Sequence, residues 1–308
     1  MPRASSVDLS VRIGKLELPY PTLMASGCYG SGEEFEAFAD LTKIGAVVLK
    51  SVTRQPRLGN PMPRLVATPA GMLNAIGLQN VGVEAFLGER LPALRDAGAR
   101  VIANFWGDSE DDFAACAARL DGAPGIVALE LNAASPNRPE WGGIIATDPV
   151  RLAAIVRAVR PRVRLPLWVK LSPNVTDIAA VGRAVEAEGA DAVTAINTLR
   201  ATSIDLAART PRLAAGAGGL SGPAIKPVAL WMVRALAAAL RIPVVGIGGI
   251  RTGEDALEFL ACGARAVQVG TATFYDPRAT VRIAGEMAAW CAAHGVGAVR
   301  DVIGTVAG

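Results

Sequence analysis

The sequence predicts an α/β fold, a single closed (β/α)8 barrel formed by residues 1–308. Three observations support this: the length of 308 residues, a hydrophobic content of 51% against 19% charged residues, and a local pattern that occurs four times. A barrel of this class takes about 250 residues plus insertions, and the hydrophobic content is enough to bury a large core. No linker rich in proline, glycine or serine divides the chain, so we expect one domain.

The repeated pattern is a helix-like stretch that ends in Gly-Ala and is followed by a short apolar segment. Glycine ends a helix by adopting the left-handed conformation, and the apolar segment after it is typical of a parallel strand buried on both faces. The four copies begin at Gly45, Gly98, Gly189 and Gly263. They predict strands at VVLK, RVIANF, DAVTAIN and RAVQVG.

Four further apolar runs, at residues 22–25, 126–131, 167–171 and 243–246, raise the number of predicted strands to eight. Helical patterns follow most of them, at residues 83–97, 111–120, 149–159, 178–188, 225–239 and 254–261. Eight alternating units with right-handed crossovers favour a closed barrel, and a doubly wound open sheet is the alternative. Residues 1–20 are expected to be an N-terminal extension, in which the alternation over residues 7–18 predicts a β-hairpin.

Charge and cysteine content exclude several classes of protein. The 31 Lys+Arg and 28 Asp+Glu leave a net charge of +3, too small to indicate nucleic-acid binding. There is no long uncharged apolar run and no signal peptide, so a soluble cytoplasmic enzyme is expected. The four cysteines are far apart, which argues against a metal or iron–sulfur site within this chain; they are Cys28, Cys116, Cys262 and Cys291. The single histidine, His294, has no acidic neighbour, so proton transfer is expected to use another side chain.

Polar residues and glycines follow the predicted strands at their C-terminal ends, where the chemistry of a barrel takes place. These strand ends are Ala25-Ser26-Gly27, Lys50, Asn104, Asn132, Lys170, Asn197, Gly246–Gly249 and Gly270-Thr271. A lysine directly after a buried strand is costly unless it meets an anion. Lys50 and Lys170 therefore indicate a bound anion, or a cofactor that becomes anionic. An ion pair or a lysine stem reaching toward solvent is the alternative.

The last two strands end in the glycine-rich segments GIGGI, residues 246–250, and VGTA, residues 269–272. Exposed backbone N–H groups at these two positions form the phosphate site of many barrels. The segment GGLSG, residues 218–222, precedes a helical stretch and is expected to add a further amide. Together they predict a cofactor that carries a phosphate. No GxGxxG pattern is present, so a dinucleotide is not indicated.

Four asparagines near the predicted rim form a third group of candidates. They are Asn74, Asn132, Asn137 and Asn197. The asparagine side chain offers one acceptor and two hydrogens to donate without charge, which suits an amide- or imide-like ligand. After Asn74, the backbone N–H groups of Gly77 and Leu78 suit a carboxylate.

Ser135 lies in the segment LNAASPN, just beyond the fourth predicted strand. The surrounding loop, residues 134–147, contains prolines and glycines and is long enough to act as a lid over an active site. A serine in a loop is usually structural. Here Asn132 and Asn137 flank it and would fix its position against a ligand, which favours a catalytic role.

At the candidate residues described above, the sequence closely resembles the dihydroorotate dehydrogenase family, specifically the catalytic subunit of the class 1B enzymes. The similarity extends from about Leu9 to the C-terminal helix, and its motifs are ASGCYGSGEE, GMLNAIGLQN, VKLSPNVTDI, AINTL, GGLSGPAIKPVAL and VGTATF. Members of the family are barrels containing FMN. They oxidise (S)-dihydroorotate to orotate in de novo pyrimidine biosynthesis.

The resemblance implies a role for each candidate residue. FMN would contact Ala25, Ser26, Gly27, Lys50, Ser51, Asn104, Asn132, Lys170 and Ile196, with its phosphate at Gly222, Gly248, Gly249, Gly270 and Thr271. The substrate would contact Lys50, Asn74, Gly77, Leu78, Asn132, Asn137, Asn197 and Thr198. Lys170 would lie near the N1/C2=O edge of the flavin and stabilise its anionic reduced form.

The sequence departs from the family at the catalytic base. Class 1 members usually have cysteine where this chain has Ser135, and that cysteine removes the C5 proton while hydride leaves C6 for flavin N5. Serine is typical of the quinone-using class 2 enzymes, whose other motifs differ from those found here. A serine base needs a positioned acceptor or water for its own proton. Residues 138–141 of the lid and Arg200-Ala201 also differ from the family pattern.

These departures leave alternatives open for the substrate and the electron acceptor. The chain could oxidise another dihydropyrimidine or a cyclic enamide, or it could be a non-catalytic flavin-binding paralogue. Resemblance to class 1B implies two kinds of partner: a second copy in a homodimer, and an iron–sulfur subunit that carries FAD and passes electrons to NAD⁺.

Overall fold

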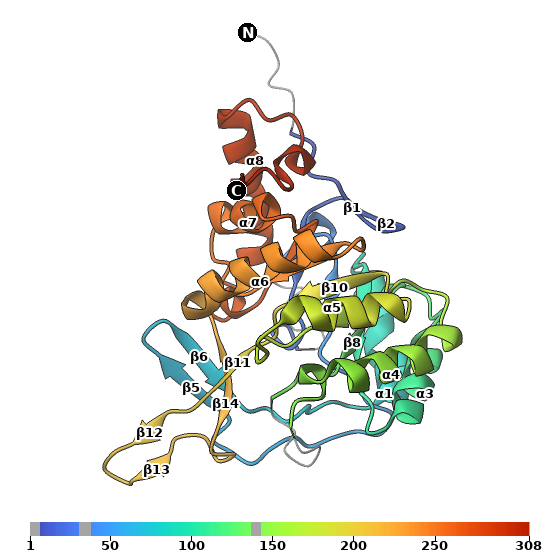
Figure 1. The fold of residues 1–308 in the computed structure, drawn as a ribbon, viewed down its shortest axis with the longest axis vertical. Coiled ribbons are helices and arrows are strands. Elements are labelled where there is room, and N and C mark those ends of the chain that lie inside the picture. Colours follow the sequence, from blue (N-terminus) through green and yellow to red (C-terminus); the bar gives the residue numbers. More distant parts are fainter. Residues whose placement is uncertain (1–6, 31–37, 137–142, 308) are drawn as a thin grey trace.

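The computed structural model describes residues 7–30, 38–136 and 143–307, and these form a closed barrel of eight parallel strands (Figure 1). The barrel strands are β3 (Thr22–Met24), β4 (Val47–Val48), β7 (Val101–Phe105), β8 (Ile126–Asn132), β9 (Leu167–Lys170), β10 (Ala192–Ala195), β15 (Val244–Ile247) and β16 (Ala266–Val269). They are neighbours in chain order, and β16 pairs with β3 to close the ring. The predicted (β/α)8 (TIM) barrel is therefore confirmed over the open sheet.

Helices follow most of the barrel strands and lie on the outside of the ring (Figure 1). They are α1 (Val83–Ala85), α2 (Leu91–Asp96), α3 (Glu110–Leu120), α4 (Pro149–Val159), α5 (Ile178–Ala187), α6 (Lys226–Ala239), α7 (Gly253–Ala261) and α8 (Ala279–Ala293). The segment predicted as one helix over 83–97 is divided, because a π-helical turn, Phe86–Arg90, separates α1 from α2. Pro92 stands in the first turn of α2, where its missing N–H cannot continue the helical hydrogen bonds.

The N-terminal hairpin is present as predicted. Strands β1 (Val11–Ile13) and β2 (Leu16–Leu18) pair antiparallel, with Ile13 opposite Leu16. Alternation decides which side chains face the protein: Val11 and Ile13 are buried, whereas Arg12 between them is exposed. The hairpin thus contributes Ile13 to the main hydrophobic core.

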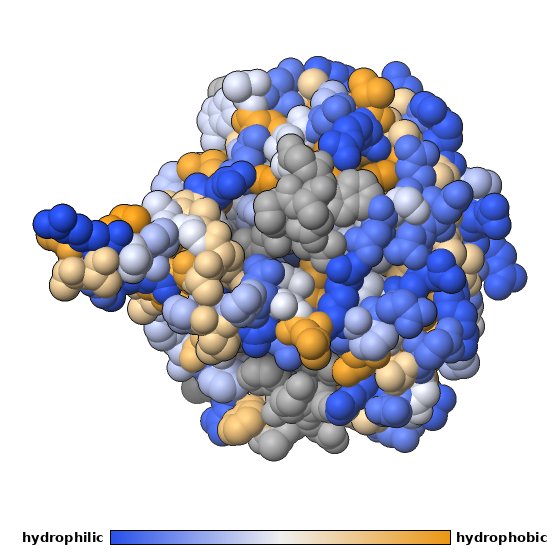
Figure 2. Space-filling view, turned by 90° about the horizontal axis from the view of Figure 1, so that it is seen from below, coloured by the Kyte–Doolittle hydropathy of each residue, from blue (hydrophilic) through white to orange (hydrophobic). Residues whose placement is uncertain are grey.

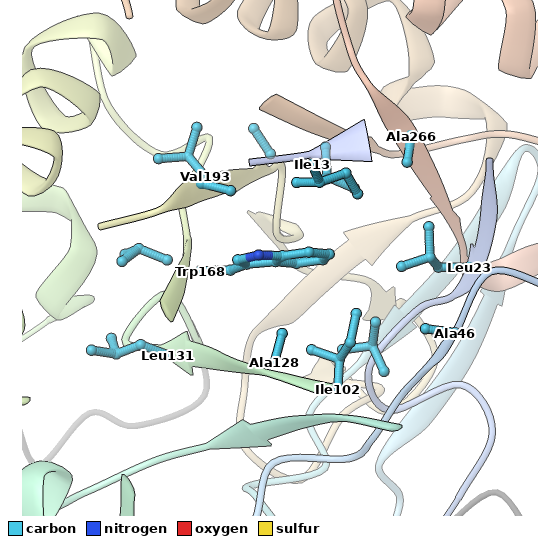
Figure 3. Packing of buried hydrophobic residues seen from close by; sticks show 14 of the residues in the cluster. Ile13, Leu23, Ala46, Ile102, Ala128, Leu131, Trp168, Val193 and Ala266 are labelled. Atoms are coloured by element: carbon cyan, nitrogen blue, oxygen red, sulfur yellow. The ribbon is translucent and has the colours of Figure 1, made fainter. Parts of the chain in front are cut away.

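The interior of the barrel is packed around the indole ring of Trp168 on β9. The side chain is fully buried and lies among Ile13 of the N-terminal hairpin and small or branched residues of other barrel strands, such as Leu23, Ile102 and Ala128 (Figure 3). Side chains two residues apart on a strand point to the same face. Lys170, the last residue of β9, therefore follows Trp168 on the interior face and lies nearer the C-terminal rim of the barrel.

A second sheet, which the sequence analysis did not predict, lies beside the rim. It is antiparallel, with the strand order β11-β14-β6-β5, and consists of β5 (Leu65–Thr68), β6 (Gly71–Asn74), β11 (Leu199–Ala201) and β14 (Gly218–Ser221). The segment GGLSG is thus mainly a strand, in which Gly219 pairs with Asn74. The hairpin β12 (Ile204–Asp205) and β13 (Thr210–Pro211) projects from this sheet (Figures 1 and 2). In Figure 2 the face seen is mainly hydrophilic, with scattered hydrophobic residues.

Part of the predicted lid lies outside the described residues. Of the loop 134–147, residues 137–142 are not among them, and Ile145–Thr147 forms a short 3₁₀ turn before α4. Within the part of the chain that the structure describes, no helix is both long and apolar enough to cross a membrane.

The packing of Trp168 gives a testable prediction for stability. Replacing this fully buried side chain with alanine, Trp168→Ala, is expected to lower the free energy of unfolding by about 3–5 kcal/mol, because it leaves a large cavity in the barrel. Trp231 on α6 is 62% exposed, and Trp231→Ala should change the same quantity by less than about 0.5 kcal/mol. Denaturant unfolding followed by circular dichroism measures both. Equal losses in the two variants would contradict the assignment of the core.

Candidate active site

A cavity of about 680 Å³ lies at the C-terminal ends of the barrel strands. Its wall includes residues at or just beyond the C-terminal ends of β3, β4, β8, β9, β10, β15 and β16, together with Leu65, Met72, Asn74 and Ser221 from the second sheet. The barrel therefore supplies one side of the cavity and the unpredicted sheet supplies another.

The cavity brings together nearly all the residues singled out from the sequence. Its lining includes Ala25, Ser26, Gly27, Lys50, Ser51, Asn74, Gly77, Leu78, Asn132, Ser135, Lys170, Ile196, Asn197, Thr198, Gly222, Gly248, Gly249, Gly270 and Thr271. Asn104 is fully buried next to Ser51 and does not line the cavity. Asn137 lies outside the described residues.

Lys170 carries the buried positive charge of the site. The residue is only 5% exposed, and its ammonium nitrogen Nζ lies 3.6 Å from Oε1 of Glu130 on β8. The two interpretations of this lysine are therefore not exclusive, because it forms an ion pair inside the barrel and also lines the cavity. Because Glu130 already pairs with the buried ammonium of Lys170, the protein does not bury an unpaired charge, and the ammonium can still attract an anion in the cavity.

Glu130 and Gln268 are buried polar residues that the sequence analysis missed. Both side chains are fully buried in the barrel, and Gln268 on β16 donates from Nε2 to Glu130 Oε2 over 2.7 Å. Glu130 Oε1 accepts from Asn104 Nδ2 at 2.6 Å. A signal was available in the sequence, since IVALELN and AVQVG each place one polar residue inside an apolar strand.

Hydrogen bonds connect this buried group to the cavity wall. Ser51 donates to Asn104 Oδ1, and its oxygen accepts from Asn132 Nδ2 at 2.8 Å. Asn132 Oδ1 in turn accepts from Asn197 Nδ2 at 3.4 Å and from the backbone N–H of Ala134 at 3.2 Å. The positions of Asn132 and Asn197 are thus fixed by a chain that starts at the centre of the barrel.

The turns after the last barrel strands approach each other closely. Gly249 has φ +75°, and a Cβ atom there would lie 2.7 Å from the Cβ of Lys226. At Gly222, φ is +94°, and a Cβ would lie 2.7 Å from the Cα of Gly71. At each position only glycine combines a positive φ with so little space for a side chain without strain. Among the described residues, no backbone hydrogen bond uses the N–H of Gly248 or Gly249, so these donors are available to a ligand.

The segment after Asn74 has an unusual backbone that bears on ligand binding. Leu78 has φ +59°, and Gly77 before it has φ +75°. A positive φ is costly for a bulky residue such as leucine, and such conformations concentrate at binding sites. Both residues line the cavity.

Ser135 and Cys28 are among the hydroxyl and thiol side chains that line the cavity, and both bear on the choice of a catalytic base. Ser135 follows β8 by three residues, and only 8% of it is exposed. Burial raises the pKa of the Cys28 thiol to about 11, an effect that the nearby charge of Lys170 only partly opposes. The thiol therefore stays protonated near neutral pH, and Cys28 presents no thiolate to the cavity.

Comparison with known proteins identifies the family. The family model described as dihydroorotate dehydrogenase matches residues 8–290. The chain belongs to this family. Its members are FMN-dependent oxidoreductases, as the sequence motifs implied.

Curated relatives specify the class within the family. The chain is 51% identical to a protein of Trichlorobacter lovleyi over 97% of this chain and 99% of that protein. It is 49% identical to one of Pelobacter propionicus and 50% identical to one of Geobacter sulfurreducens, over 97% of this chain and 98% of each relative. All three are named dihydroorotate dehydrogenase B (NAD(+)), catalytic subunit. The resemblance to class 1B is confirmed.

The cavity fits the cofactor of this family. Gly248 and Gly249 offer backbone N–H groups that suit a phosphate, and Lys170 offers a buried cation that suits a flavin whose reduced form is an anion. Both groups line the same cavity.

The close approach at Gly249 predicts an effect on cofactor binding. Gly249→Ala should lower the affinity for FMN by at least about tenfold, because an L residue at this φ is strained and the new methyl group meets Lys226. Gly285 in α8 is a matched control, since a Cβ there meets nothing within 4 Å. Titration of the apoprotein with FMN, followed by the change in flavin fluorescence, measures both affinities. Unchanged affinity in Gly249→Ala would exclude this turn from the cofactor site.

Proposed function

We propose that this chain is the catalytic subunit of a class 1B dihydroorotate dehydrogenase, which oxidises (S)-dihydroorotate to orotate in de novo pyrimidine biosynthesis. One observation carries the proposal: a single cavity collects a buried lysine, three asparagines, a serine and the glycine turns. The naming of the curated relatives supports the same activity.

The cofactor would be held at both ends. We propose that Gly222, Gly248, Gly249, Gly270 and Thr271 receive the phosphate of FMN, and that Ala25, Ser26, Gly27, Lys50, Ser51, Asn104, Asn132, Lys170 and Ile196 surround the rest. Asn104 does not line the cavity, and it would support the cofactor site by accepting a hydrogen bond from Ser51. When bound, FMN supplies the acceptor for the hydride that leaves C6 of the substrate.

The substrate would lie against the asparagines and the Gly77-Leu78 turn. Amide groups of Asn74, Asn132 and Asn197 complement the C=O and N–H groups of a dihydropyrimidine ring. The proposed contacts also include Thr198, Asn137 and the charge of Lys50, which with the N–H groups of Gly77 and Leu78 suits a carboxylate.

We propose Ser135 as the base for the C5 proton. Oxidation removes a proton from C5 and a hydride from C6, so that a C5=C6 double bond forms and two electrons leave the substrate. Ser135 Oγ takes the C5 proton and must pass its own hydroxyl proton to water or another acceptor, because an alkoxide is hard to form. The ammonium of Lys170 would stabilise the negative charge of the reduced flavin.

Flavin reduction tests this function. Anaerobic addition of dihydroorotate to the holoprotein should bleach the flavin absorbance, and Ser135→Ala should slow the bleaching by about 10²–10⁴-fold. Cys28→Ala is the matched control and should leave the rate within about threefold, because Cys28 follows β3 and its thiol donates to the backbone carbonyl of Ser26. An unaffected rate in Ser135→Ala would remove the base assignment.

The same measurement separates the alternative functions. Bleaching by dihydrouracil, but not by dihydroorotate, would indicate a different dihydropyrimidine as substrate, since only dihydroorotate presents a carboxylate. Holoprotein that is reduced by neither compound would indicate a non-catalytic paralogue.

We also propose that electrons leave through a partner subunit that carries an iron–sulfur cluster and FAD, and that the catalytic chain is a homodimer. Within the described residues there is no group of three or more His, Cys, Asp or Glu side chains that could hold a metal ion. NADH should therefore form from dihydroorotate and NAD⁺ only after the partner subunit is added, measured at 340 nm. NADH formation by this chain alone would contradict the proposal.

A further inference from the structure

We infer that Glu130 is a positioning residue, which offsets the charge of Lys170 beneath the flavin site and sets the direction of the hydrogen bonds that reach Asn132. The inference rests on the proposed function for the identity of the ligands, and it assigns a role to a residue that lies outside the cavity lining.

Both oxygens of the Glu130 carboxylate are occupied inside the barrel. Oε1 accepts from Asn104 at 2.6 Å and lies 3.6 Å from the ammonium of Lys170, while Oε2 accepts from Gln268 at 2.7 Å. These partners come from β7, β9 and β16, so the carboxylate joins three strands besides its own. No part of Glu130 is exposed.

The first consequence concerns charge. The Lys170 and Glu130 side chains are only 7% and 0% exposed, so water screens them little. As a pair they carry no net charge, and the ammonium faces the cavity with its positive charge partly offset. The glutamate therefore limits how strongly the site favours an anionic reduced flavin over the neutral oxidised form. A lower flavin potential eases the onward transfer of electrons.

The second consequence concerns the direction of hydrogen bonds. A carboxylate only accepts, so the amide nitrogen of Asn104 must face Glu130 and its oxygen must face Ser51. Ser51 then donates to Asn104 and accepts from the amide nitrogen of Asn132. This leaves the oxygen of Asn132 directed at Asn197. A carboxylate at the centre of the barrel thus fixes the orientation of the side-chain amides of Asn104 and Asn132 in turn.

The stability of the core alone does not account for a buried ion pair between Glu130 and Lys170. A buried ion pair with its hydrogen bonds is seldom more stabilising than apolar side chains of equal volume. Trp168 and Ala128, each two residues before a member of the pair on the same strands, show that the barrel interior accepts apolar side chains.

Two variants separate the two roles. Glu130→Gln keeps the shape but removes the negative charge, so the ratio of affinities for reduced and oxidised FMN should rise about tenfold. That change equals a rise of about 30 mV in the midpoint potential of a two-electron couple. Asn104→Leu breaks the chain of hydrogen bonds without changing the net charge, so the affinity for orotate should fall about tenfold, with a smaller change in potential than in Glu130→Gln.

The control is Thr194→Val, which alters a fully buried side chain of β10 whose hydroxyl has no hydrogen-bond partner among the described residues. It should leave both quantities unchanged. Midpoint potentials are measured on holoprotein by reduction against a reference dye, and orotate affinity by the change in the flavin spectrum.

An unchanged or lower potential in Glu130→Gln would overturn the charge role, and unchanged orotate affinity in Asn104→Leu would overturn the directional role. If Glu130→Gln does not fold, the result for Asn104→Leu still decides the second role. The potential is measured without dihydroorotate. Failure of the wild type to oxidise that compound would therefore refute the proposed function and leave the potential measurement as a test of Glu130.

Discussion

Parallel pairing around a closed ring is the constraint on which the site depends. Because all eight strands run in one direction, each delivers its last residues to the same rim, and residues two apart share the interior face. On β8 this gives Ala128, Glu130 and Asn132 in succession, and on β9 it gives Trp168 and Lys170. On these two strands the interior therefore changes from apolar packing to a polar, charged layer within two residues.

Much of this arrangement could be predicted because its signals are local. The glycine that ends a helix and the apolar run after it are neighbours in sequence in four places, and the ends of the barrel strands were located within two residues. The second sheet is different, since it pairs Asn74 with Gly219, and its strands contain glycines and few alternating apolar residues. Periodicity cannot detect such strands, because pairing with distant residues, not side-chain pattern, stabilises them.

Which residues meet at the cavity could also be predicted from local signals, whereas their roles stay predictions. Residues at strand ends, such as Lys170 and Asn132, stand out because polar groups follow apolar runs. Glu130 was missed because it lies inside such a run, where its role depends on partners from three other strands. Likewise, the sequence places Cys28 in a conspicuous motif, and only the structure shows that its surroundings raise the pKa of its thiol.

The second sheet also links two regions that perform different tasks. Strand β14 pairs with β6 beside Asn74 at one end, and at the other its Ser221 accepts a hydrogen bond from Thr271 Oγ1 at 2.8 Å, next to Gly222. One short strand thus spans the distance between the wall that would contact the pyrimidine and the turn that would hold the phosphate. A phosphate bound at the turn would restrain β14, and with it the part of the cavity wall next to Asn74. The cofactor would therefore bind first, and the substrate would then bind to a wall that is already ordered.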